Sequence, residues 1–475
     1  MREGNYVTML DPFHKKFGAR MGGLLFIPAV LGELFWSAAI LSALGATITV
    51  IVGLDDISSI VVSACIAIVY TMFGGLYSVA YTDVVQLICI FVGLWICVPF
   101  ALTNEKVADI SSTSPRWLGE LDVSAVGVYI DNYLVLLLGG IPWQALFQRI
   151  LSSKSTETAM KVTYVSAMGC AIMCVPSILI GAVATSADWT NTTFGRMPGV
   201  NGSDYEARLV LPLVLQNFTP SAVAFIGLGA VSAAVMSSAD SSVLSASSMF
   251  SWNIYKMLCR EKASDREILW VMKGAVVAMG FLAAGLAILV PSVYGLYFLC
   301  SDLVYCILFP QLVLVLYFKD VNTYGSLAGY LVALVLRLLA GEPTFGIPAA
   351  VGYFYVADDG SQLFPFRTFA MLVNLLTTVS VSLLAKYLFV QRELLPMAWD
   401  VFRCFVPTDE PELRPHNPLF LQKVAESHTS DGQCSPGRTS LDKVSDIKFG
   451  GKGVKHEDLG LTDGKGTFNY GFSQL

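Results

Sequence analysis

The chain has 475 residues, of which 55% are hydrophobic and 14% are charged, and its formal net charge is −6. Soluble globular proteins carry about 25% charged residues, so the low charged fraction excludes a soluble globular protein. The acidic residues are spread over loops and tail, so the net charge gives no indication of a nucleic-acid partner, and we expect none. The sequence carries no phosphate-binding loop and no soluble-enzyme motif, so we expect neither an ATP-driven pump nor an enzyme with a bound cofactor.

Ten apolar segments are long enough to cross a bilayer as helices, which predicts an all-α polytopic membrane protein embedded in lipid. They cover residues 24–52, 57–79, 83–102, 127–150, 163–186, 220–256, 268–290, 292–317, 322–340 and 365–391. We divide the chain into an N-terminal segment (1–23), a transmembrane domain (24–391) and a tail (392–475). The tail is polar and lacks periodicity, which is typical of disordered segments that bind regulatory proteins.

The positive-inside rule predicts the orientation of the spans. Lys and Arg gather near the N-terminus and in segments 149–161 and 256–266, which places both chain termini in the cytosol. Segment 187–208 then lies outside the cell. It holds two N-glycosylation sequons, at Asn191 and Asn201, and this supports the same orientation.

The first span carries a carboxylate and an indole on one face. Glu33 lies three residues before Trp36, a spacing that brings two side chains together on a helix. A carboxylate inside a membrane indicates either function or a structural hydrogen bond. Trp36 is in mid-span, whereas most membrane tryptophans lie at the interfaces. Asp83, which follows Thr82 at the start of the third span, is interpreted as a helix cap.

The fourth span is interrupted near its middle by Gly139, Gly140 and Pro142. Proline removes a helical hydrogen bond and clashes with the preceding turn. Broken backbone at membrane depth is tolerated only inside protein or against a wet cavity, and secondary transporters place solute and ion sites there. Trp143 follows the break and Asp131 precedes it. The sequence therefore predicts a binding site at the break.

Two indoles near a helix break favour a cationic solute. Aromatic faces attract a quaternary ammonium, which cannot donate hydrogen bonds, by about 2 kcal/mol when it is desolvated. A sugar would need a dense set of hydrogen-bonding side chains, of which the break offers few. We expect Trp36 and Trp143 to contact the solute, and we name Glu33 and Asp131 as acidic members of the same site.

The sixth span is rich in serine and small residues between Gly229 and Ser242. Ser237 and Ser238 follow Ala234 by three and four positions, so one helical turn brings the Ala234 carbonyl near both hydroxyls. Such oxygens can bind Na⁺, but serines and small residues are equally typical of helix packing. The pattern predicts either a sodium site or a packing surface.

Two further charges lie in later spans. Asp302 is in the eighth, where function and structural hydrogen bonding both remain open. Arg337 is in the ninth, and we expect its long side chain to reach the outer membrane surface.

Four segments resemble the sodium/solute symporter family, and most closely its members that take up choline with high affinity. They are Asn5–Phe13, Gly74–Gln86, Gly140–Ala145 and Gly227–Phe250. The likeness extends over about residues 5–390 and implies a symporter core of two inverted five-helix repeats. It also implies choline uptake by alternating access that depends on Na⁺ and Cl⁻ and supplies acetylcholine synthesis.

The same resemblance implies roles for single residues. Ala234, Ser237 and Ser238 match the family's sodium-binding positions, and Trp36 and Trp143 match aromatic positions of its choline pocket. It further implies a protein of the plasma membrane, presynaptic terminals and synaptic vesicles. Homo-oligomers and trafficking proteins bound to the tail are expected partners.

The family pattern includes a leading helix and two core helices before the part that this sequence matches. Because the first core helix supplies sodium ligands, we expect that these 475 residues alone do not couple sodium to choline. Two alternatives remain open. The chain is a sodium symporter for another small solute, such as a sugar, proline or a vitamin, or it is a non-transporting form that acts through bound partners.

Overall fold

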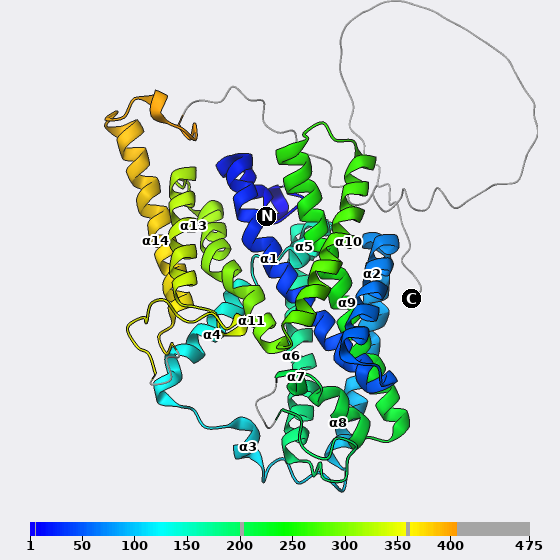
Figure 1. Ribbon diagram of the computed structural model, residues 1–475. Coiled ribbons are helices and arrows are strands. Elements are labelled where there is room, and N and C mark those ends of the chain that lie inside the picture. The colour runs from blue at the N-terminus through cyan, green and yellow to red at the C-terminus, as the bar shows by residue number, and fades with distance from the viewer. Residues whose placement is uncertain (5, 200–203, 358–361, 406–475) are drawn as a thin grey trace, which may run out of the picture. The chain divides into compact units, whose positions relative to one another are not determined.

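The computed structural model describes residues 1–4, 6–199, 204–357 and 362–405, without the side chains of residues 3, 75–78, 204 and 205. These residues form helices almost throughout (Figure 1), and their β contacts are isolated bridges. Nine of the described helical segments are long and apolar enough to cross a membrane. A shorter apolar helix of 17 residues lies at the ninth predicted span. The all-α polytopic fold is thereby confirmed, while most of the predicted tail lies outside the described residues.

The main helices are α1 (Asp11–Val52), α2 (Asp56–Leu102), α4 (Val126–Gly139), α5 (Gln144–Ser152), α6 (Thr156–Ser186), α8 (Val210–Phe218), α9 (Ser221–Met249), α10 (Asp265–Leu289), α11 (Val293–Leu303), α12 (Phe309–Tyr317), α13 (Thr323–Leu339) and α14 (Phe366–Lys386). The short helices α3 (Ser114–Leu118) and α7 (Asp204–Ala207) lie in loops. Wider π-helical turns follow α9 at Phe250–Cys259, join α11 to α12 at Val304–Leu308, and follow α14 at Tyr387–Gln391.

Helix α1 begins at Asp11, earlier than the sequence predicted. Pro12 suits the first turn, because its missing N–H would be unpaired there in any case. The Asp11 carboxylate accepts hydrogen bonds from the N–H groups of Val7 and Thr8 at 2.7 and 3.1 Å, which stabilises this start. Gly18 has a φ of 81°, a left-handed conformation that glycine adopts at little cost, and it marks a kink.

Helix α2 folds back on itself and so accounts for two predicted spans. The Tyr70 hydroxyl donates a hydrogen bond to the Thr82 hydroxyl at 2.5 Å. Twelve residues of straight helix rise about 18 Å, so the chain reverses direction between these two residues. The two halves of this hairpin, Asp56–Gly74 and Val79–Leu102, are each long enough to cross the membrane.

Helix α9 packs against α1, α2 and α10. Small residues allow this close approach: a Cβ added to Gly93 of α2 would lie 2.5 Å from the Ala230 methyl of α9. An apolar cluster rich in alanine, which includes Ala38, Ala64 and Ala239, fills the space between these helices. The serine-rich sequence of α9 is therefore partly explained by packing.

Helices α13 and α14 form an antiparallel pair near the C-terminal end of the described chain (Figure 1). Gly329 of α13 faces Thr378 and Asn374 of α14, and no side chain larger than hydrogen fits there. At one end of the pair, Lys386 and Asp320 form an ion pair of 2.7 Å with partly exposed side chains. At the other end the pair contacts α4 and the turn after α11.

Candidate functional site

The fourth span is broken between the end of α4 at Gly139 and the start of α5 at Gln144. Trp143 has extended backbone, with φ −107° and ψ 120°, and its N–H donates to the Ile141 carbonyl at 2.9 Å. Gly139 cannot carry a side chain, because an added Cβ would lie 2.7 Å from the Ser301 carbonyl oxygen of α11. The break therefore lies directly against α11.

Three aromatic side chains meet beside the break, and we call them the aromatic cage: Trp36, Trp143 and Tyr297. The ring centroids of Trp36 and Trp143 are 6.4 Å apart, with the planes at 89°. The centroids of Trp36 and Tyr297 are 5.6 Å apart. A Cβ added to Gly32 would lie 3.6 Å from the Trp143 ring, so this glycine leaves room for the indole. All three rings keep part of their surface exposed.

The sequence analysis missed Tyr297. It lies in an aromatic stretch with Tyr294 and Phe298, and the helical period alone does not tell which ring faces Trp36. The structure decides this, because Cys300, one turn after Tyr297, lies against Gly32 of α1. Only the pairing of α1 with α11 identifies the third ring of the cage.

Glu33 is buried and faces α9 rather than the cage. One of its carboxylate oxygens accepts a hydrogen bond from the Ser242 hydroxyl at 2.6 Å. The Ser37 hydroxyl donates to Ser242 at 2.9 Å and completes this chain. The carboxylate therefore joins α1 to α9, one turn away from Trp36.

Asp131 is buried and caps a different helix. Its carboxylate accepts hydrogen bonds from the N–H and the hydroxyl of Thr368 at 2.7 and 2.6 Å, and from the N–H of Arg367 at 3.2 Å. The residue before α14 is Pro365, which has no side-chain acceptor, so α4 supplies the cap. None of these contacts is with the aromatic cage.

The candidate sodium residues lie one turn apart on α9. The Ser238 hydroxyl donates to the Ala234 carbonyl at 3.1 Å, and the Ser237 hydroxyl donates to the Asp83 carboxylate at 2.5 Å. The serines are half-buried. One carbonyl, two hydroxyls and one carboxylate thus supply hard oxygen atoms in a small volume, which is the donor chemistry that Na⁺ takes.

The interpretation of Asp83 as a helix cap is wrong. Asp83 lies inside the α2 hairpin, bonds Ser237, and forms an ion pair of 3.1 Å with Arg149. Arg149 also donates to the Ser241 hydroxyl at 2.7 Å. Because Arg149 belongs to α5, this cluster joins the part of the broken helix that follows the break to the serine face of α9.

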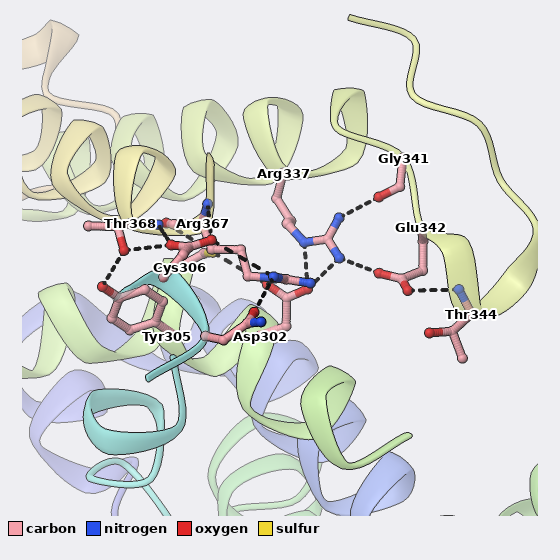
Figure 2. A network of polar contacts seen from close by, with 11 residues as sticks. Asp302, Tyr305, Cys306, Arg337, Gly341, Glu342, Thr344, Arg367 and Thr368 are labelled. Atoms are coloured by element: carbon pink, nitrogen blue, oxygen red, sulfur yellow. Dashed lines mark hydrogen bonds and ion pairs between the residues drawn. The ribbon is translucent and has the colours of Figure 1, made fainter. Parts of the chain in front are cut away.

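A second cluster of charges lies at the α13–α14 pair (Figure 2). Arg337 donates through Nε to Asp302 at 2.5 Å, and its other nitrogens bond the Gly341 carbonyl and the Glu342 carboxylate. The side chains of Arg337 and Asp302 are only 5% and 2% exposed. The expectation that Arg337 reaches the outer surface is therefore wrong, because a buried carboxylate neutralises it in place.

One of the two predicted glycosylation sites can be placed. Asn191 is exposed in the loop after α6, whereas Asn201 lies outside the described residues. In the same loop Arg196 donates two hydrogen bonds to Glu206 and holds the pKa of that carboxyl below its ordinary value.

A cavity beside the start of α5 is lined by Thr8, Gln144 and other side chains. Its volume of about 30 Å³ holds one or two water molecules but no organic solute.

Comparison with known proteins adds to this geometry. The family model described as "Sodium:solute symporter family" matches residues 1–333. The high-affinity choline transporter 1 of Drosophila melanogaster is 52% identical over 437 residues, which cover 92% of this chain and 69% of that protein. The human high affinity choline transporter 1 is 54% identical over 416 residues, covering 86% and 71%.

A solved structure is also similar. It is the substrate-bound outward-open state of a Na⁺-coupled sialic acid symporter, which matches with a TM-score of 0.64. The match covers 81% of this chain and 78% of the other at 19% identity. At that identity the likeness shows a shared fold and says nothing about the solute.

Proposed function

This chain belongs to the sodium:solute symporter family, and we propose that it moves choline into the cell by coupling it to sodium. The observation that carries this proposal is the meeting of Trp36, Trp143 and Tyr297 beside a helix break. The names of the similar transporters agree with the same solute.

Choline suits this cage because of its charge distribution. Its quaternary ammonium cannot donate hydrogen bonds, so ring faces attract it better than hydroxyl or amide groups do. Three rings from α1, the start of α5 and α11 meet there, and we propose that the cation binds against their faces. We propose that Glu33 acts at longer range, as a source of negative potential one turn from Trp36, and that Asp131 positions α4.

We propose that sodium binds at Ala234, Ser237 and Ser238, with Asp83 as a neighbouring carboxylate. Na⁺ would draw on the lone pairs of these oxygens and partly neutralise Asp83. Arg149 already pairs with Asp83, so the cation and the guanidinium compete for one carboxylate. Sodium binding then changes the contact between α9 and the part of the broken helix that follows the break.

We propose that this change in the contact between α9 and α5 drives alternating access. Choline enters at the break and the helices rock to expose the site to the cytosol. The membrane potential contributes about 2.3 kcal/mol per charge per 100 mV, so an inside-negative cell draws both cations inward. The proposal includes chloride dependence, cytosolic termini, residence in the plasma membrane and synaptic vesicles of nerve terminals, and supply of choline for acetylcholine synthesis.

Uptake of labelled choline tests the proposal. Cells with little uptake of their own express the protein. We expect choline uptake that disappears when potassium replaces sodium. Choline uptake that does not depend on sodium, or no choline uptake at all, would contradict the proposal.

Two rivals make different predictions. A symporter for a sugar or for proline would transport that solute and would not respond to loss of the cage rings. A non-transporting form would show no uptake of its own and would reduce the uptake of a co-expressed choline transporter through contact with it.

A further inference from the structure

The α13–α14 pair contributes no ring to the aromatic cage. It does contact α11 and α4, two helices that lie next to the cage. Arg337 of α13 and Arg367 of α14 both approach Asp302 of α11, Arg367 through Nε at 3.5 Å (Figure 2). Arg367 also lies 3.8 Å from the Asp131 carboxylate of α4. The two guanidinium groups therefore attach α11 and α4 to one support.

Asp302 directly follows the part of α11 that lies against the cage. A Cβ added to Gly32 of α1 would lie 2.8 Å from the Cys300 carbonyl, and one added to Gly139 would lie 2.7 Å from the Ser301 carbonyl. This backbone is wedged between α1 and the helix break. Tyr297 lies about one turn earlier on the same helix, so any shift of α11 moves this ring relative to Trp36.

A second contact joins the same elements. The hydroxyls of Tyr305 and Thr368 are 3.1 Å apart, which links the turn after α11 to the start of α14. Thr368 in turn donates to Asp131 through both its N–H and its hydroxyl. The end of α4 at Gly139 packs on Tyr305. The α13–α14 pair therefore contacts both α4 and the turn after α11, which lie on either side of this packing.

We propose that Arg337 and Arg367 are positioning residues for the aromatic cage, acting through Asp302 and Asp131 and touching no solute. This rests on the proposed choline site. A cation held between rings loses affinity when one ring moves, and a misplacement of about 1 Å can cost up to roughly 100-fold in activity.

The test compares the wild type with the double variant Asp302→Asn, Arg337→Gln. Both charges are removed together, because a single change leaves either Asp302 or Arg337 as a buried charge with a partner missing, which destabilises the protein for a trivial reason. Glu342 also pairs with Arg337, and in the double variant it keeps its hydrogen bond from the Thr344 N–H. At matched surface expression we expect the choline KM to rise about tenfold or more, with the half-saturating sodium concentration unchanged. A wild-type KM in the double variant would show that the pair only balances charge.

A native thiol gives a readout that does not depend on choline. Cys300 of α11 is 3% exposed, and its backbone carbonyl lies against Gly32 of α1. We expect a thiol reagent to label it several-fold faster in the double variant, as quantified on its peptide by mass spectrometry, while buried Cys97 of α2 stays protected. Continued protection of Cys300 would overturn the proposal. If the wild type neither binds nor transports choline, the proposed function fails, and the labelling still decides the positioning role.

The chain offers a matched control on the same helices. Asp320 and Lys386 form a partly exposed ion pair at the other end of the α13–α14 pair. The double variant Asp320→Asn, Lys386→Gln should keep both the choline KM and the protection of Cys300. An equal effect in this control would mean that general loosening of the helix pair causes the change, and it would refute the assignment to Arg337 and Arg367.

Discussion

Two ion pairs of the helical domain differ in how far the protein covers them. Arg149 and Asp83 have side chains that are 40% and 22% exposed, whereas Arg337 and Asp302 are almost completely buried. An exposed pair gains little from its attraction and can exchange partners, while a buried pair cannot be opened without a large cost. The first pair suits a site where a cation enters, and the second suits a fixed support.

Loss of one charge from each pair should give the largest contrast. Asp302→Asn removes the buried carboxylate that pairs with the buried guanidinium of Arg337. This loss should destabilise the protein by about 3–5 kcal/mol. Asp83→Asn leaves Arg149, which is 40% exposed, without a buried unpaired charge, so the stability of this variant should stay near that of the wild type. Thermal unfolding in detergent measures both. Equal losses of stability would abolish the distinction between the two pairs.

The aromatic cage should show the next largest effect. Trp143→Ala removes a ring face worth about 2 kcal/mol for a desolvated ammonium, which corresponds to a rise of roughly 30-fold in the choline KM. Trp143→Phe should recover part of the loss. Trp270→Ala is the control, because Trp270 lies exposed on α10. Unchanged choline affinity in Trp143→Ala would refute the cage.

The sodium residues should show a smaller and separable effect. Ser237→Ala removes one of the oxygens proposed to bind the cation, so the half-saturating sodium concentration should rise roughly tenfold, which corresponds to about 1.4 kcal/mol of binding free energy. Choline uptake measured over a range of sodium concentrations gives this value. Ser232→Ala is the control, because that hydroxyl donates to the Leu228 carbonyl of its own helix at 2.9 Å and is not among the proposed sodium ligands. A shift of equal size in the control would remove the argument for a site.

The smallest effect is expected for an ion pair outside the membrane. Arg196 lowers the pKa of Glu206, so this contribution is present above the ordinary carboxyl pKa and is lost as the pH falls through the lowered value. The contribution is thus present between about pH 6 and pH 8, but it is small because the pair is partly exposed, so the unfolding temperature of Glu206→Gln should stay close to that of the wild type there. A marked loss in that range would show that exposure does not predict the worth of an ion pair here.

The sequence predicted what depends on local chemistry. Apolar length identifies the spans, and glycines with Pro142 identify the break that the structure has between α4 and α5. It could not predict which helices meet. Tyr297 joins Trp36, Asp83 bonds Ser237, and Arg337 stays buried only because α11, the α2 hairpin and α13 pack where they do. Side-chain contacts between distant spans leave no periodic signal along one sequence.

The affinity of the purified protein for choline, measured at a series of sodium concentrations, decides whether the two sites are coupled. If sodium at α9 favours the choline-binding state, choline must bind more tightly as sodium rises, and sodium must bind more tightly in the presence of choline. We predict that Trp143→Ala weakens choline at every sodium concentration but keeps this dependence, and that the double variant Ser237→Ala, Ser238→Ala loses it. Choline affinity that does not change with sodium in the wild type would contradict the proposed symport.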